Sequence, residues 1–308
     1  MFGKLFGKGK EKGERKTGRH KISFGLKTTI FNVVGLRSIP PMPGAAQTAF
    51  QLSTDPDAAA RDFIDVIESD ESLSARVMKI ANSVYFDRGE GSKTIEHAVQ
   101  VIGLQELKSL LNACSLTDIF PSRHSARQQL WVNDVATAIT ARTLAAKLLP
   151  GKEDFAFLAG LMHDIGKLLI LQQAEVKYAR VLTLVQQGVP FSNAEEEVFA
   201  FNHSEVGTLV AEKWRFDEEL IEAIQGHHER IDPAQAKGEL NISQIIQISD
   251  LICHTCGFGH PNGWGKFQSL SEEQLKELWP ITGLNSDELE NFIDSIKETV
   301  ETELELYS

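Results

Sequence analysis

The stretch from Phe155 to Ile170, FAFLAGLMHDIGKLLI, places a histidine, an aspartate and a lysine inside an otherwise apolar run. A helix that is apolar on every side is typically buried. Burying a carboxylate without a partner costs several kcal/mol. We therefore expect Asp164 to meet a metal ion, a cation or several hydrogen-bond donors, and His163 to have a partner as well.

Sequence motifs around this stretch resemble a known family. The H-D-x-G-K run of the HD superfamily of metal-dependent phosphohydrolases is matched by His163, Asp164, Gly166 and Lys167. Three upstream runs narrow the resemblance: IPPMP at 39–43, LSTDPD at 52–57 and SARVMKIANS at 74–83. Their order resembles the HDOD family, HD-related output domains of bacteria that are regarded as signalling modules without demonstrated catalysis. The resemblance covers roughly residues 27 to 256.

This resemblance implies a set of metal ligands. His163 with Asp164 would form the metal-binding pair, and Asp250 would be the final aspartate of the HD pattern. Lys167, one turn after His163, lies where the family uses a lysine to contact a phosphate group. Imidazole and carboxylate ligands suit iron, manganese, zinc or nickel, so the resemblance leaves the identity of any divalent metal open.

Three more histidines follow downstream. His203 begins an expected helix, and His227 and His228 end another. The resemblance makes them counterparts of the histidines that form a second metal position in the cyclic-dinucleotide phosphodiesterases of the superfamily. His228 has the weakest case, because a residue at a helix end is commonly exposed.

Two departures from the family pattern argue against catalysis. Where HD proteins place their first histidine ligand, this chain has Asn133 followed by Asp134. An amide oxygen is a neutral and weak ligand, although Asp134 could take its place. No Gly-Tyr-Pro triplet follows the histidine pair at 227–228, which argues against hydrolysis of cyclic di-GMP by the known route.

Three interpretations of the candidate site stay open. In the first, His163, Asp164, His203 and Asp250 hydrogen-bond to one another in the core and never bind a metal, which is enough to satisfy buried polar groups. In the second, the pocket binds a metal or a nucleotide without turnover. In the third, it is a working phosphohydrolase of nucleotides or cyclic dinucleotides. We favour a signalling protein that acts through protein partners and is not an enzyme.

The cysteines offer a separate zinc hypothesis, in which Cys253 and Cys256 bind the ion with His260. Structural zinc normally takes four well-spaced ligands, and a C-x-x-C run without a second pair is a weak signal. We expect these cysteines to be small residues at the end of a helix. A chain with three cysteines and no secretory signal should keep them reduced.

Charge is divided unevenly along the chain. The first 21 residues carry eight Lys and Arg against two Glu, so from a total of −12 the remaining residues carry −18. Nucleic-acid binding is driven by basic residues that displace counterions, so this acidic body argues against direct contact with DNA or RNA.

The basic tail could touch an anionic membrane surface weakly. No run reaches the roughly 18 to 20 apolar residues of a membrane span, and the start lacks the apolar core of a signal peptide, so we expect a cytoplasmic protein.

Apolar periodicity predicts helices throughout, and strand signals are missing, so the expected fold is all-α in two lobes. We expect a disordered basic tail at 1–24, a helical N-terminal lobe at 25–122, an HD-like helical lobe at 123–258, and a C-terminal loop with an amphipathic helix at 259–308. Asp70 should cap one helix, and Asn285 with Glu288 gives the capping-box signal of the last. In the HD-like lobe, helices are expected at 131–149, 155–171, 175–187, 191–201, 204–214, 217–227 and 241–256.

Overall fold

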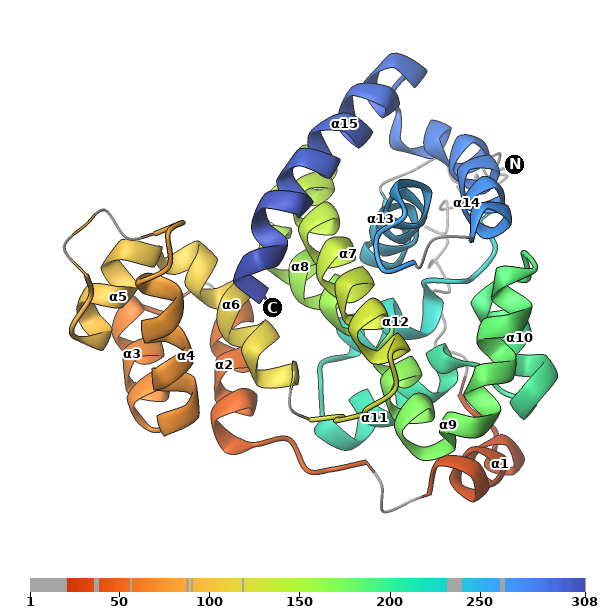
Figure 1. Cartoon of the computed structure of the whole chain (residues 1–308), viewed down its shortest axis with the longest axis horizontal. Coiled ribbons are helices and arrows are strands. Elements are labelled where there is room, and N and C mark those ends of the chain that lie inside the picture. Colours follow the sequence, from red (N-terminus) through yellow and green to blue (C-terminus); the bar gives the residue numbers. More distant parts are fainter. Residues whose placement is uncertain are drawn as a thin grey trace, which may run out of the picture.

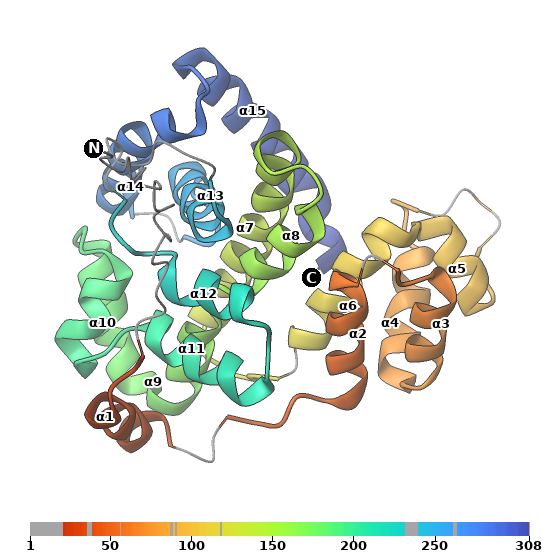
Figure 2. The same ribbon diagram turned by 180° about the vertical axis from the view of Figure 1, so that it is seen from behind.

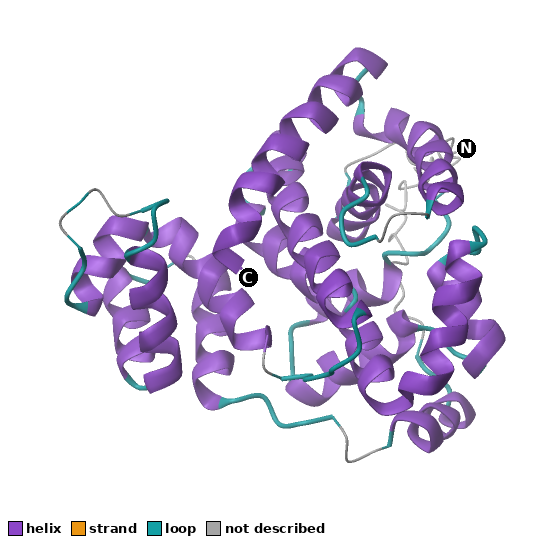
Figure 3. Cartoon of the chain, viewed as in Figure 1, coloured by secondary structure: helices purple, strands orange, loops and turns teal. Residues whose placement is uncertain are grey.

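The computed structural model describes residues 21–35, 39–55, 57–86, 89, 91–117, 119–231, 240–260 and 264–307. Within these ranges every regular element is a helix, which confirms the expected all-α fold (Figure 3). None of the described helices is long and apolar enough to cross a membrane. The predicted basic tail, apart from its last few residues, lies outside the described ranges, as does the run that begins at Asp232.

Helices α2 to α6 form a group at one end of the molecule (Figure 1). They are α2 (Gly44–Thr54), α3 (Ala60–Glu68), α4 (Glu71–Ala81), α5 (Ile95–Ile102) and α6 (Leu104–Thr117). Asp70 caps α4 as predicted, because its side chain accepts a hydrogen bond of 2.9 Å from the Leu73 amide. Phe63, Ile67 and Val77 are fully buried in the core of this group.

A second group of helices carries the candidate site (Figures 1 and 2). Its members are α7 (Ala126–Leu148), α8 (Glu153–Met162), α9 (Ile165–Gln186), α10 (Phe191–Phe199), α11 (His203–Trp214), α12 (Glu218–Gly226) and α13 (Ile242–Cys256). Small residues of α7, among them Ala136, Ala138 and Ala141, are fully buried. They let α8 and α13 pack closely on α7, which is the central helix of this group.

The expected single helix from 155 to 171 is wrong at its centre. α8 ends at Met162 and α9 begins at Ile165, so His163 and Asp164 lie in the turn between two helices. Both helices are buried here, so the apolar run continues across the break, and periodicity cannot separate two consecutive buried helices from one. We expected one helix to end at 171 and the next to begin at 175. The structure has a kink there instead, because Ala174 has non-helical backbone angles (φ −135°, ψ 38°) inside α9.

The last helices return across the molecule. α14 (Gly265–Leu278), which we did not predict, and the 3-10 helix η1 (Trp279–Thr282) lead into α15 (Ser286–Glu303), which lies along α7 (Figure 1). The predicted capping box of α15 is confirmed: the Glu288 amide donates to Asn285 Oδ1 over 2.9 Å, and the Asn285 amide donates to Glu288 Oε2 over 2.8 Å. The 3-10 helix η2 (Leu304–Tyr307) then lies against both α6 and α7, where the two groups of helices meet.

α1 (Phe24–Val34) packs against α9, although the sequence places residues 25–122 in one N-terminal lobe. Lys27 of α1 forms an ion pair of 3.2 Å with Glu212 of α11. The proline-rich link after α1 is held to the same helix, because Trp214 Nε1 donates to the Pro40 carbonyl over 2.9 Å. The boundaries of the lobes stay a prediction.

The contact between α7 and α8 leaves no room at Gly160. A Cβ atom added there would lie 2.7 Å from the Ala138 Cα atom. We expect Gly160→Ala to lower the free energy of unfolding, measured by urea denaturation, by about 1–3 kcal/mol, the typical cost of overpacking. The control is Gly25→Ala, whose methyl group meets nothing within 4 Å and whose alanine favours the helix. Equal stability of the two variants would show that α8 can move away from α7.

Candidate metal centre

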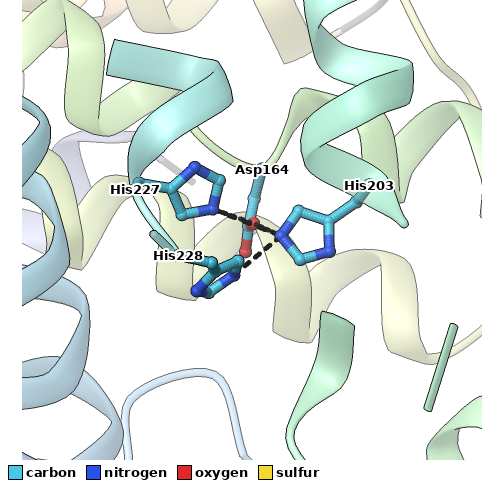
Figure 4. Close-up of side chains that lie close together, drawn as sticks. All are labelled: Asp164, His203, His227 and His228. Carbon is cyan, nitrogen blue, oxygen red and sulfur yellow. Dashed lines mark hydrogen bonds and ion pairs between the residues drawn. The ribbon is translucent and has the colours of Figure 1, made fainter. Parts of the chain in front are cut away.

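Four side chains from three parts of the fold converge in the second group of helices (Figure 4). Asp164 comes from the turn between α8 and α9, His203 from the first turn of α11, and His227 and His228 from the end of α12. One ligand atom from each lies within 4.8 Å of the others. Asp164, His203 and His227 are buried, whereas His228 is exposed on one side and turns its Nε2 atom inward.

Close packing of α9 on α11 brings Asp164 to His203. A Cβ atom at Gly166 would lie 2.0 Å from the His203 carbonyl oxygen, so only glycine allows this approach. The capping box of Asn202 and Glu205 begins α11 at His203 and sets the direction of its first turn. Local sequence signals therefore place two of the four side chains.

The four ligand atoms of the cluster are close enough to one another to surround a single cation. His203 Nε2 lies 3.1 Å from Asp164 Oδ1, 3.2 Å from His227 Nε2 and 2.9 Å from His228 Nε2. His227 Nε2 lies 3.6 Å from the same Asp164 oxygen. That oxygen, Asp164 Oδ1, is buried and has no hydrogen bond. A single proton on His203 Nε2 cannot be directed at all three neighbours, whereas one cation at the centre would contact all four atoms.

The other ring nitrogen of each buried histidine is already engaged. His227 Nδ1 lies 2.7 Å from the Ile224 carbonyl, and His203 Nδ1 lies 2.5 Å from Glu195 Oε2. Carbonyl and carboxylate oxygens only accept, so both Nδ1 atoms must donate. When a ring is neutral, the lone pair at Nε2 faces the cluster, which is the tautomer that binds metals. Burial lowers the pKa of His203, but Glu195 and Asp164 raise it above its ordinary value, so an ion would displace a proton from this ring. Burial lowers the pKa of His227 to about 4, which keeps this ring neutral.

Glu195 of α10 positions His203, and sequence reasoning missed it. Its carboxylate is fully buried and accepts hydrogen bonds from the His203 backbone amide (2.7 Å) and from the Tyr178 hydroxyl (3.1 Å). Burial and the nearby carboxylate raise the pKa of Tyr178 well above its ordinary value. The sequence does indicate that Glu195 is buried, since it lies on the apolar stripe of α10 between Phe191 and Phe199.

Lys167 is committed to the interior of the protein. Its side chain is 1% exposed, its ammonium group pairs with Asp164 Oδ2, and Nζ lies 4.1 Å from the centre of the Phe191 ring. Burial alone would lower the pKa of Lys167, but Asp164 and the more distant carboxylates raise it above its ordinary value. Lys167, which we expected to contact a phosphate group, thus neutralises Asp164.

A second group of three acids and imidazoles lies beside the first. It consists of Asp134, His163 and Asp164, again within 4.8 Å of one another. Both carboxylate oxygens of Asp134 are buried without a hydrogen bond, and burial together with Asp164 raises its pKa well above the ordinary value. Burial lowers the pKa of His163, but Asp164 and Asp250 raise it more, to about 9.

Asp250 lies near this second group but is held by other side chains. Its Oδ1 atom lies 3.5 Å from His163 Nε2 and accepts a hydrogen bond of 3.3 Å from the Asn133 amide group. Its Oδ2 atom lies 3.1 Å from His254 Nε2, and His254 Nδ1 in turn lies 2.6 Å from His260 Nε2. Asn133 therefore lies next to Asp250 and donates a hydrogen bond to it. A residue that stands in place of the first histidine ligand should lie in this position.

The cysteine-based zinc hypothesis finds no group of ligands among the described residues. No cysteine joins either converging cluster, and all three cysteines are free thiols. Cys253 Sγ lies 3.3 Å from Thr140 Oγ1, and burial raises the pKa of Cys256 to about 11. His260, the third ligand of that hypothesis, contacts His254, and both belong to the chain of contacts that ends at Asp250.

Solvent reaches this region through a small cavity of about 60 Å³. Phe191, His228, Gln247, Asp250 and His254 are among its lining residues. Binding sites for drug-sized ligands usually measure roughly 300–1,000 Å³. The cavity therefore has room for water or a very small ion beside His228, and none for a nucleotide.

Removing the Lys167 charge should destabilise the protein, because the Asp164 carboxylate is buried beside it. In protein treated with a chelator, we expect Lys167→Met to lower the free energy of unfolding by about 3–5 kcal/mol, because the buried Asp164 carboxylate loses its nearest cation. Urea denaturation measures this loss. Lys276→Met, which breaks an exposed pair with Glu272, should leave stability unchanged. If both variants are equally stable, Lys167 does not balance Asp164.

Two solved structures with this fold come from bacteria. An HDOD domain protein with unknown function from Geobacter sulfurreducens has 23% sequence identity and a TM-score of 0.66, over 89% of this chain and 96% of that one. A protein from Shewanella amazonensis SB2B, named "Putative phosphohydrolase", has 23% identity and a TM-score of 0.63, over 91% and 95% of the two chains. At these identities the likeness shows the shared fold alone.

A curated relative and a family model match the sequence directly. An uncharacterized protein of Treponema pallidum (strain Nichols) is 26% identical over 195 residues, which is 62% of this chain but only 37% of that protein. The family model of the HDOD domain matches residues 39–230. This range is more than half of the chain and includes Asp164, His203, His227 and His228, so the chain belongs to the HDOD family.

Proposed function

We propose that this protein is a cytoplasmic signalling module that holds one divalent metal ion through Asp164, His203, His227 and His228, and that acts through protein partners without hydrolysing a substrate. The observation that carries the proposal is the set of three imidazole Nε2 atoms around one carboxylate oxygen, with the Nδ1 atoms of the two buried rings already donating elsewhere. The free thiols agree with a reducing compartment.

The spacing of the four atoms fits a metal ion. Nitrogen ligands lie about 2.0–2.1 Å from zinc, so two ligands of the same tetrahedral or octahedral ion are about 2.9–3.4 Å apart. The distances of His203 Nε2 to its three neighbours run from 2.9 to 3.2 Å, and His227 Nε2 is slightly farther from Asp164, at 3.6 Å. A bound ion would accept the lone pairs of the ring nitrogens and contact Asp164 Oδ1, the oxygen that the Lys167 pair leaves without a hydrogen bond. Imidazole and carboxylate ligands suit zinc, iron, manganese or nickel.

Three features support a role without turnover. Asn133 stands where the family pattern has a histidine, and its amide nitrogen is occupied by Asp250. Lys167 pairs with Asp164 and is not available to a phosphate group. The cavity beside His228 is about 60 Å³, too small for a nucleotide. Because HDOD domains are regarded as signalling modules, an output through a protein surface accounts for a closed site better than hydrolysis does.

The second group, Asp134, His163 and Asp164, supports a weaker position for another cation. Its carboxylates could neutralise an ion, and the unpartnered oxygens of Asp134 are available to it. Only one imidazole contributes, so transition metals should prefer the first group. Asp250 would remain outside both positions while His254 and Asn133 hold it.

Metal content tests the proposed centre. We expect about one divalent ion per chain in the purified protein by plasma mass spectrometry, and a loss of that ion in His203→Ala. Glu195→Gln keeps all four ligands but weakens the support of His203, and should reduce metal affinity by about 10- to 100-fold. His97→Ala, on α5 of the other group of helices, is the matched control and should keep its metal. Equal metal content in His203→Ala and His97→Ala would contradict the assignment.

Turnover tests the absence of catalysis. We expect no release of pGpG or GMP from cyclic di-GMP, and no hydrolysis of mononucleotides, by metal-loaded protein in the presence of manganese, iron or nickel under reducing conditions. Chromatography of the nucleotides measures the products. Metal-dependent hydrolysis that disappears in Asp164→Ala would make the protein a phosphohydrolase and overturn the non-catalytic role.

A further inference from the structure

A larger cavity, of about 310 Å³, lies where α4, α6 and η2 meet. None of its lining residues belongs to the metal centre. Its volume is at the lower end of the range for small-molecule sites, which often lie at the junction of two structural units. In Figure 1 the C-terminal end of the chain reaches this junction beside α6. The cavity is therefore large enough for a small organic molecule.

Its lining combines two cations with an unpartnered hydroxyl group. Arg76 and Lys79 lie one turn apart on α4, and Ser83 follows the helix. Arg76 Nη1 donates to the Cys114 carbonyl over 3.1 Å, which anchors the guanidinium group at the cavity wall. Ser83 Oγ is buried and has no hydrogen bond. Glu305 is the acidic residue of the lining, so basic side chains outnumber acidic ones in a body that is otherwise acidic.

Apolar groups form the rest of the cavity. Ile80 of α4 and Leu306 and Tyr307 of η2 line it, and the Tyr307 hydroxyl is turned away because it donates to Glu106 Oε1 over 2.8 Å. A ligand that fits must therefore present a compact apolar body to these residues and a negative group to Arg76. Planar guanidinium groups bind carboxylates and phosphates through two parallel hydrogen bonds.

We propose that this cavity binds a small organic anion, a carboxylate or phosphate ester joined to a compact apolar group. Arg76 and Lys79 bind the anionic group, Ser83 donates its free hydroxyl, and Ile80 with Leu306 contacts the apolar part. The site is independent of the proposed metal centre, because the two share no residue.

The cavity is connected to the central helix α7 through η2. The Tyr307 carbonyl accepts a hydrogen bond of 3.1 Å from Trp131 Nε1. Trp131 is on α7, two residues before Asn133 and three before Asp134. A ligand that contacts η2 therefore acts on the segment that is attached to the central helix of the metal-binding half, and we assign the cavity as an input site of this signalling protein.

Binding of matched probes tests the chemistry of the ligand. Benzoate, benzamide and benzamidine share one flat apolar body and differ in charge, and phenyl phosphate separates phosphate from carboxylate recognition. In calorimetric titrations of the full chain at low salt, we expect benzoate or phenyl phosphate to bind with a dissociation constant of about 1 mM or lower. Benzamide and benzamidine should bind at least about tenfold more weakly, because they lack the negative charge. Equal affinity for benzoate and benzamide, or no binding of either anion, would overturn the proposal.

Variants of the cations test the location. Arg76→Met should weaken binding of the anionic probe by about tenfold or more, the loss expected for a hydrogen bond to a charged group. Lys79→Met, which alters an exposed side chain and keeps the fold, should weaken it by about threefold. Arg61→Met removes an exposed cation on neighbouring α3 and is the matched control. If Lys79→Met binds as tightly as Arg61→Met, the anion does not occupy this cavity.

Indole resonances test the link to α7. Trp131 and Trp279 each donate through Nε1, to the Tyr307 carbonyl and to the Asn285 carbonyl at the far end of α15. In ¹⁵N-labelled protein, the Trp131 indole signal, assigned with Trp131→Phe, should move when the anionic probe is added, whereas that of Trp279 stays. An unmoved Trp131 signal at saturation would contradict the role of the cavity as an input site.

Discussion

The structure depends on one constraint, which is the burial of the Asp164 carboxylate in an apolar interior. A charge in this position is stable only when cations or donors surround it. Lys167 provides one cation from the next turn of α9, while His203 and His227 bring ring nitrogens from two other helices. The close approach at Gly166 and the buried Glu195 follow from the same requirement, because both fix His203 against Asp164.

The two halves of the site differ in how completely they are satisfied. Around Asp250, protein groups contact both carboxylate oxygens: Asn133 and His163 lie at Oδ1 and His254 at Oδ2, and His260 supports His254. Around Asp164 Oδ1, histidine ring nitrogens gather at one oxygen that lacks a hydrogen bond. Asn133, expected from the resemblance to stand where the family pattern has a histidine, thus belongs to a closed hydrogen-bonded arrangement on one side, and the other side has the geometry that a cation needs. This asymmetry is the physical basis of the proposed metal binding without hydrolysis.

Much of the fold was predictable because its helices carry local signals. Asp70 and the Asn285–Glu288 capping box mark helix starts that the structure reproduces. The break at His163 was not predictable, because two buried helices in succession share one apolar run. Asp164, His203, His227 and His228 were all candidates from the resemblance, and they converge. The place of Glu195 on the apolar stripe of α10 predicts that it is buried, but its contact with His203 joins two helices and depends on tertiary packing.

Anomalous X-ray scattering from crystals of the metal-loaded protein tests the central claim most directly. Data collected on both sides of the absorption edge of the bound metal locate the ion without reference to activity. The account predicts a peak surrounded by Asp164 Oδ1 and the Nε2 atoms of His203, His227 and His228, at about 2.0–2.2 Å from each nitrogen. A map with no peak there, and with hydrogen bonds among these side chains, would contradict it and would identify the cluster as a purely structural network.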